Sequence, residues 1–216
     1  YGNRLGVFAT PRLHARYNPW ENGVLRFSAG RGKREANIFA ENQTYFASSR
    51  TFNIMDAGGE IYGLDPEIAW NYGLSFMQSF TLFNQKGDVG FDFQNQVVVD
   101  VMESPQEVIF HNLDGTSFAN SFQLEFNYEI IKHLELRTAY KYYDIETDYL
   151  SGTFQRPLQA KHRFFANLGF KTHIKDKGQQ WKFDFTYNWI GEQQLPYTAS
   201  NPLEYQFPEY SPDYSL

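Results

Sequence analysis

The sequence has no cysteine among its 216 residues. Disulfide scaffolds, thiolate metal sites and cysteine nucleophiles are therefore excluded together, since each requires a cysteine sulfur. The length is sufficient for one all-β domain.

Long apolar runs and an excess of basic residues are also missing. No stretch approaches the roughly 20 apolar residues that a transmembrane helix needs, so helical insertion into a membrane is excluded. The mean hydropathy of -0.55 is that of a soluble protein, but alternating strands average their two faces and hide a lipid-exposed surface. The formal net charge is -6 and no basic stripe is present, which argues against nucleic acid as a partner.

Clusters that would carry catalysis or hold a metal are lacking as well. The histidines, at positions 14, 111, 133, 162 and 173, include no pair at helical ligand spacing and no neighbouring carboxylate cluster. Ser75, His162 and Glu125 have the residue types of a catalytic constellation, but nothing in the sequence brings them together. We therefore expect no metal, no cofactor and no enzymatic activity.

Aromatic residues are abundant, at 19% of the chain. In the stretch WKFDFTYNWIG, residues 181–191, aromatic side chains take every second position and polar side chains lie between them. Because a strand turns successive side chains to opposite faces, this stretch predicts a ribbon with one aromatic and one polar side. The aromatic side would face a protein core in a soluble sandwich and lipid in an outer-membrane barrel.

Eight segments of the chain alternate in this way. Most of them reach the roughly 9 to 11 residues that a tilted strand needs to cross a bilayer. Strands of globular proteins usually have about 5 or 6 residues. The segments are residues 10–17, 24–30, 67–83, about 89–101, 122–130, 134–142, 161–171 and 181–191.

The connections between these segments alternate strictly between short and long. Short hairpin turns with Asn, Gly, Asp or Pro are expected at 18–23, 84–88, around 132 and at 173–180. Long connections are expected at about 31–66, 102–119, 144–160 and from 191 onward. Sorting of loop length by end is typical of barrels with tight periplasmic turns and long extracellular loops. The sequence therefore predicts an all-β, antiparallel up-and-down transmembrane β-barrel.

Three alternatives remain open at this point. A soluble β-sandwich would bury the aromatic faces between two sheets. A soluble ligand-binding barrel would turn those faces inward around an apolar ligand. A small, complete outer-membrane barrel with a structural or adhesive role would keep both termini periplasmic, whereas the loop pattern puts them on the side of the long connections.

Several motifs match a known pattern in order and spacing. Most of the match lies in two segments, TPRLHARYNPWENGVLRFSAGRGKREANIFAEN and LDPEIAWNYGLSF. Two further segments, NLDGTSFANSFQLEFNY and KHRFFANLGF, continue the match, so that it covers essentially the whole chain. The sequence resembles the distal barrel of TonB-dependent outer-membrane receptors, particularly the Bacteroidetes type. The matching residues are Thr10, Pro11, Arg12, Tyr17, Pro19, Leu25, Arg26, Ser28, Gly30, Gly32, Arg34, Leu64, Pro66, Glu67, Trp70, Asn71 and Tyr72.

This resemblance implies a 22-stranded barrel around a plug, with a TonB box near the N-terminus. It implies a location in the cell outer membrane and energy-coupled import of a scarce ligand, such as a ferric siderophore complex. The implied partners are outer-membrane lipid, the TonB complex acting through the plug, and a small-molecule or metal-chelate ligand. Residues 1–216 would then be one partial barrel domain of about eight strands, without the plug, the TonB box and the final strands.

Alternation also assigns the side chains to two faces. Those expected to face lipid are Trp70, Tyr72, Leu74, Phe76, Phe164, Leu168, Phe183, Phe185 and Tyr187. Those expected to face the lumen are Arg12, Arg16, Asn71, Ser75, Arg163 and Asn167.

A ligand would be met in the upper lumen, beneath the long connections. Arg12, Asn71, Gln123, Lys161 and Arg163 are expected there, because periplasmic short turns require the strands at 10, 67, 119 and 161 to enter from outside. Their cationic and amide donors suit a ligand rich in carboxylates or other oxygen acceptors.

The longest connection is the expected lid over such a ligand. It would carry Arg34 as a binding residue, together with Arg31, Lys33 and Arg50.

Overall fold

The computed structural model describes most of the chain. The described residues are 7–35, 38–41, 43–46, 51–59, 61–97, 101–103, 107–112, 117–149, 152–155, 158–174, 179–195, 198 and 202–216.

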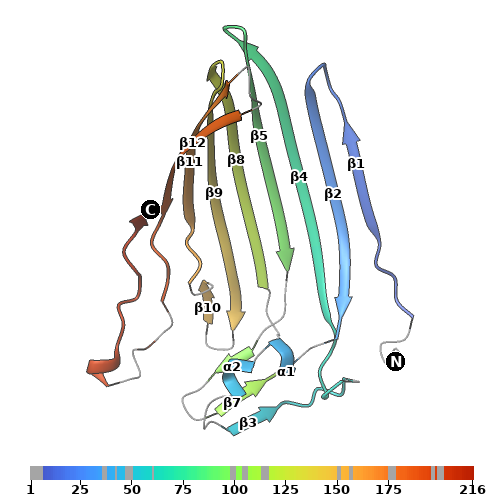
Figure 1. Cartoon of the computed structure of the whole chain (residues 1–216). Coiled ribbons are helices and arrows are strands. Elements are labelled where there is room, and N and C mark those ends of the chain that lie inside the picture. Colours follow the sequence, from blue (N-terminus) through green and yellow to red (C-terminus); the bar gives the residue numbers. More distant parts are fainter. Residues whose placement is uncertain are drawn as a thin grey trace.

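Ten strands form one curved sheet (Figure 1), in the order β1-β2-β4-β5-β8-β9-β11-β12-β13, with β10 paired to β9. Every strand pair in this sheet is antiparallel. Its strands are β1 (Arg12–Tyr17), β2 (Gly23–Arg34), β4 (Glu67–Leu82), β5 (Gln85–Val97), β8 (Ser117–Ile131), β9 (Leu134–Tyr149), β10 (Gly152–Gln155), β11 (His162–Ile174), β12 (Gln179–Ile190) and β13 (Tyr214–Ser215).

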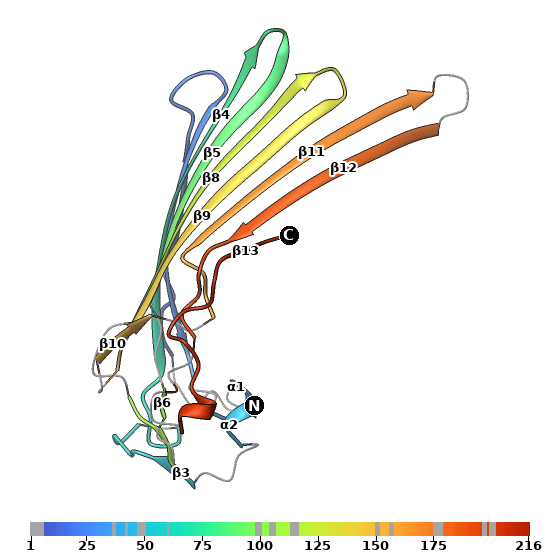
Figure 2. The ribbon, with the colours of Figure 1, turned by 90° about the vertical axis from the view of Figure 1, so that its left-hand side faces the viewer.

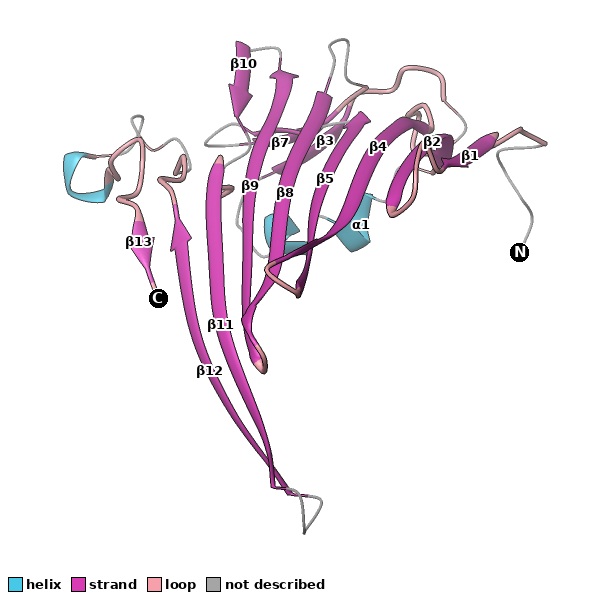
Figure 3. Cartoon of the chain, turned by 90° about the horizontal axis from the view of Figure 1, so that it is seen from above, coloured by secondary structure: helices cyan, strands magenta, loops and turns pink. Residues whose placement is uncertain are grey.

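All eight predicted segments are strands of this sheet, so the antiparallel up-and-down architecture is confirmed. The boundaries differ most in β9, which continues to Tyr149 beyond the predicted end at 142. Residues 143–149 are mostly polar and carry no aromatic alternation, but their backbone pairs with β8 and β10. Within the described residues, β1 and β13 are the outermost strands and do not pair with each other. The described sheet is therefore an open piece of curved wall (Figure 3).

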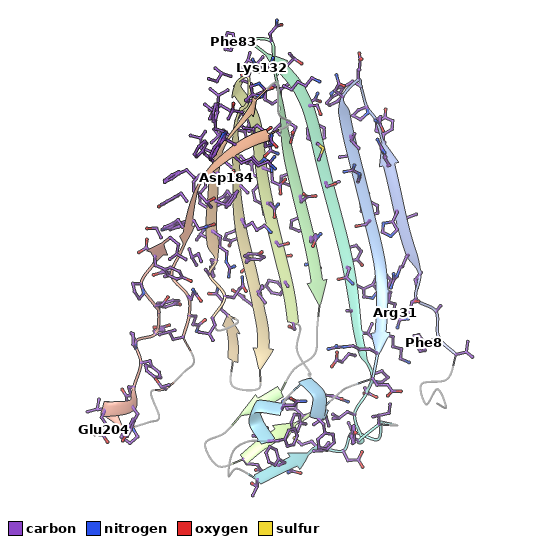
Figure 4. All side chains as sticks on the ribbon, viewed as in Figure 1. Phe8, Arg31, Phe83, Lys132, Asp184 and Glu204 are labelled. Carbon is purple, nitrogen blue, oxygen red and sulfur yellow. The ribbon has the colours of Figure 1, made fainter. Side chains whose placement is uncertain are left out.

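Short turns and long connections lie at opposite ends of this wall (Figure 2). The turns near Phe83 and Lys132 are at the end labelled with these residues in Figure 4, far from Phe8 and Arg31. Phe83 and Asn84 have positive φ angles of 50° and 64°, the type I′ geometry that matches the twist of a tight hairpin. The predicted sorting of connection lengths is confirmed.

Two of the long connections are folded rather than irregular. They contain α1 (Ile38–Glu41), α2 (Gln43–Phe46), β3 (Thr51–Ile54), β6 (Val101–Glu103) and β7 (Glu107–Phe110). The three strands form a second sheet in the order β3-β7-β6, in which β3 and β7 are parallel. We call this unit, the described residues within 38–64 and 101–112, the loop subdomain.

A small hydrophobic core stabilises the loop subdomain. Ile38, Leu64, Val108 and Phe110 are buried together, with Phe46 and Ile54 packed against them. The sequence analysis gave these residues only as long connections, and the structure adds that they fold together. The sequence signal is weak because these elements have only three or four residues each, and β3 pairs with β7 from the other long connection.

The remaining described element is the 3₁₀ helix η1 (Leu203–Tyr205). Within the described residues, no helix has the length and apolar character required to span a bilayer.

Candidate ligand-facing surface

Strand register joins the polar side chains of the large sheet into continuous rows. One row runs across seven strands and consists of Arg16, Arg26, Ser75, Asp92, Gln123, Lys141 and Arg163. Directly paired residues point to the same face, so all seven side chains share one side of the sheet. We call this side the polar face.

This row crosses the wall diagonally. Arg16 is next to the last residue of β1 and lies near a short turn, whereas Arg163 is the second residue of β11 and lies near a long connection. The strands are therefore staggered along the wall, as tilted barrel strands are. One row thus links the two ends of the wall.

The opposite side, the apolar face, carries the aromatic side chains. All nine residues expected to face lipid belong to it, and all six expected to face the lumen belong to the polar face, so the grouping into two faces is confirmed. Its side chains are largely uncovered; Phe185 is 71% exposed. Because no described second sheet packs on this face, the soluble-sandwich alternative is wrong.

Arg12 and Asn71 lie in one row of the polar face, both opposite Gly30 on β2. The missing side chain of Gly30 leaves an open position between them, where a Cβ atom would lie 3.5 Å from Arg12 Cγ. The structure thus brings these two predicted residues together on one face.

Gln123 and Arg163 lie on either side of Lys141 in the long row. The Arg163 guanidinium lies 5.8 Å from the ring centre of Tyr143, and its Nε is buried without a hydrogen-bond partner among the described groups. Lys161 precedes β11, and its carbonyl accepts a hydrogen bond of 2.8 Å from the Tyr143 amide. The structure thus brings Gln123, Lys161 and Arg163 to neighbouring positions.

Arg34 differs from the prediction. It is the last residue of β2 rather than part of a loop, and it forms a salt bridge with Glu67, its direct partner on β4. Arg31 and Lys33 also belong to β2, on the apolar face, where Lys33 lies 5.2 Å from the ring centre of Phe8. Arg50 lies outside the described residues. Arg31, Lys33 and Arg34 therefore belong to the wall, because β2 continues to pair with β4 as far as Glu67.

A hollow of about 340 Å³ lies over β1, β2, β4 and β5 and was not predicted from the sequence. Its polar lining includes His14, Arg16, Arg26, Ser28, Ser75 and Asp92. The sequence feature that could have indicated this hollow is the short turn at 18–22. Its length fixes the strand register, which places Arg16 opposite Arg26.

No catalytic constellation forms among the described residues. His162 pairs with Tyr142 on the apolar face, where the Tyr140 hydroxyl is 2.6 Å from its Nδ1. Ser75 and Glu125 are on the polar face, so the three residues cannot act together. In the described part of the chain, no group of three or more His, Cys, Asp or Glu side chains is placed to hold a metal ion.

These features define the wall of a transmembrane β-barrel: long antiparallel strands, an exposed aromatic face, a polar face and hairpin turns sorted to one end. The chain belongs to the TonB-dependent receptor-like β-barrel family, whose model matches residues 1–216. Barrels of this family reside in the outer membrane, and its members are receptors and transporters. The resemblance noted from the sequence is thereby confirmed.

Two solved structures share the fold. The siderophore receptor PiuA from Acinetobacter baumannii has a TM-score of 0.62 and 15% identity, over 96% of this chain and 28% of that chain. FpvA of P. aeruginosa, in a structure with heterologous pyoverdines, has a TM-score of 0.61 and 13% identity, over 95% of this chain and 26% of that chain. The chain thus spans little more than a quarter of either protein. No curated protein matches the sequence.

Proposed function

We propose that these residues form part of the wall of an outer-membrane receptor that imports a scarce, oxygen-rich ligand, such as a ferric siderophore complex, with energy supplied through TonB. In this proposal the apolar face contacts lipid and the polar face lines a water-filled lumen. The two similar structures, a siderophore receptor and a complex of FpvA with pyoverdine and iron, support this choice of ligand class.

The pairing of Lys141 with Arg163 is the observation that carries the proposal. The two cations occupy directly opposed positions on β9 and β11, and neither forms an ion pair with a described acidic group. Like charges at such positions repel each other unless an anion lies between them. Carboxylates and other anionic oxygens would accept hydrogen bonds from both side chains.

Gln123 and Lys161 would extend this site. Gln123 is the direct partner of Lys141 on β8, and the Lys161 backbone pairs with Tyr143, two positions along β9. Arg12 and Asn71 would contact the ligand from the same polar face but from strands β1 and β4, where they flank Gly30 on β2. Arg34 would act near the long connections only as part of its ion pair with Glu67.

A deletion strain provides the first test. Growth would be measured on single iron, cobalamin or glycan sources at limiting concentration. We expect poor growth on one iron chelate, and we expect the natural gene to restore normal growth. Normal growth on every iron chelate would contradict the proposed ligand class. A defect on no source at all would favour the alternative of a structural or adhesive barrel.

Binding variants provide the second test. Arg12→Ala combined with Arg163→Ala should weaken ligand binding by about tenfold or more, because each arginine supplies charge-assisted hydrogen bonds. Arg137→Ala is the matched control, since Arg137 is on the same face but donates to Glu135 Oε2 at 2.9 Å. Unchanged uptake by the double variant, with normal amounts of barrel in the membrane, would remove both arginines from the site.

A further inference from the structure

The hollow over β1, β2, β4 and β5 contains an opposed arginine pair. Arg16 and Arg26 are direct cross-strand partners, and both line the hollow on the polar face. Cross-strand partners have their Cβ atoms about 5 Å apart, so two like charges there destabilise the pair unless something neutralises them.

Nothing described in the protein neutralises these two charges. Arg16 Nε donates a hydrogen bond to Asn18 Oδ1 at 3.3 Å, which leaves its terminal nitrogens available. Neither guanidinium forms an ion pair with a described carboxylate. The nearest acid in their row, Asp92, is two strands away from Arg26, beyond Ser75.

The lining of the hollow suits an anion on the β1–β2 side. His14 and Ser28 are partners in the adjacent row, so an imidazole and a hydroxyl flank the arginine pair. Gly73 follows Ser28 in that row and adds no side chain, so the Ser28 hydroxyl lies over it; a Cβ atom at Gly73 would be 2.5 Å from Ser28 Oγ. Asp92 at the far side would repel an anion and confine it to the arginines.

We propose that Arg16 and Arg26, with His14 and Ser28, form an anion-binding subsite for a carboxylate or phosphate group, separate from the Lys141–Arg163 pair. Two guanidinium groups offer the fork geometry that these planar or tetrahedral anions accept. The subsite lies near a short turn, so it would hold the anion at the far end of the lumen from the long connections. This placement rests on the proposed function, because it requires the polar face to line the lumen.

Two sources could supply the anionic group. It could belong to a mobile ligand passing along the wall, or to an acidic side chain of another segment of the same protein. The chemistry of recognition is the same, so the experiment must separate the sources.

Thermal unfolding of the natural receptor chain in detergent, at constant ionic strength and increasing citrate, provides the test. For a mobile anion we expect the unfolding midpoint to rise with citrate, because a ligand that binds only the folded state stabilises it. Arg26→Gln should weaken the apparent citrate affinity about tenfold, and Arg26→Lys should weaken it less. Arg137→Gln, which removes a cation already paired with Glu135, should respond like the natural protein.

The second source gives a different result. If an acidic side chain of the protein occupies the subsite, citrate has no effect on the natural protein, and Arg26→Gln lowers the midpoint more than Arg137→Gln does. Two outcomes would overturn the proposal. One is an undiminished citrate response in Arg26→Gln. The other is no citrate response together with an unchanged or raised midpoint in Arg26→Gln, because an empty site only loses repulsion when one arginine is removed. Neither readout depends on transport, so a failure here is distinguishable from failure of the uptake tests.

Discussion

Asn167 donates a hydrogen bond from Nδ2 to Thr186 Oγ1 at 2.9 Å, across the pair β11 and β12. Both side chains are on the polar face, and the next residues along each strand, Leu168 and Phe185, are partners on the apolar face. Adjacent positions on these two strands therefore carry a hydrogen-bonded polar pair on one face and an exposed apolar pair on the other.

We therefore expect Phe185→Arg to impair membrane insertion far more than Thr186→Arg. A charge on the lipid face costs about 2–4 kcal/mol at the bilayer midplane, whereas a charge on the lumen side stays in water. The amount of folded, heat-modifiable barrel in outer-membrane fractions measures the difference. Equal amounts of the two variants would contradict the assignment of the faces.

The sequence was sufficient to predict the wall but not the parts that depend on distant contacts. Alternation such as Phe183, Phe185 and Tyr187 reports the facing of each residue directly, because the side-chain period of a strand is two. It does not report pairing in segments without aromatic residues. For that reason Arg34 was assigned to a loop, although its backbone pairs with Glu67.

The loop subdomain shows the same limit. Val108 and Ile38 meet in its core from segments 70 positions apart, and neither segment has a periodic pattern long enough to predict. The hollow is a further example, because Arg16 and Arg26 come together with Ser75 and Asp92 only when three strand registers are known. The face to which a single side chain points was therefore predictable from the local period. Clusters that depend on several strand registers were not.

Burial of Phe110 predicts a local stability effect. Phe110 is 3% exposed in the core of the loop subdomain, whereas Phe83 is 86% exposed in a short turn. Phe110→Ala should destabilise the loop subdomain by about 3–5 kcal/mol, and the exposed control Phe83→Ala should have little effect. Hydrogen exchange should accelerate in β3, β6 and β7 and stay unchanged in β8 and β9. Uniform acceleration throughout the chain would mean that the subdomain does not unfold separately.

Two glycines of β5 form a matched pair for testing packing on the wall. A Cβ atom at Gly87 would lie 2.5 Å from Phe80 Cζ and 2.9 Å from the Asn127 carbonyl oxygen, whereas one at Gly90 would have no neighbour closer than 3.9 Å. Gly87→Ala should therefore destabilise the folded barrel by about 1–3 kcal/mol through overpacking. Gly90→Ala should be neutral or stabilise it by up to about 1 kcal/mol, because alanine restricts the unfolded chain.

Urea unfolding in detergent micelles would compare the two glycine variants. The Phe80 ring also stacks near Phe126 and Tyr128, at centroid distances of 6.1 Å, so its displacement should change near-ultraviolet circular dichroism in Gly87→Ala alone. Similar losses of stability in both variants would indicate that the ring does not occupy the space above Gly87.

The ion pair of Arg34 with Glu67 predicts a structural role that can be separated from ligand binding. The Arg34 side chain is 55% exposed and that of Glu67 only 14%, so solvent screens the pair from one side. A double-mutant cycle with Arg34→Gln and Glu67→Gln should give a coupling energy of about 0.2–1 kcal/mol, which falls as salt is raised. Because Glu67 already neutralises the guanidinium, Arg34→Gln should reduce ligand binding less than Arg163→Gln does. A larger loss of ligand binding in Arg34→Gln, with normal barrel assembly, would mean that ligand displaces Glu67 and that the end of β2 belongs to the binding site.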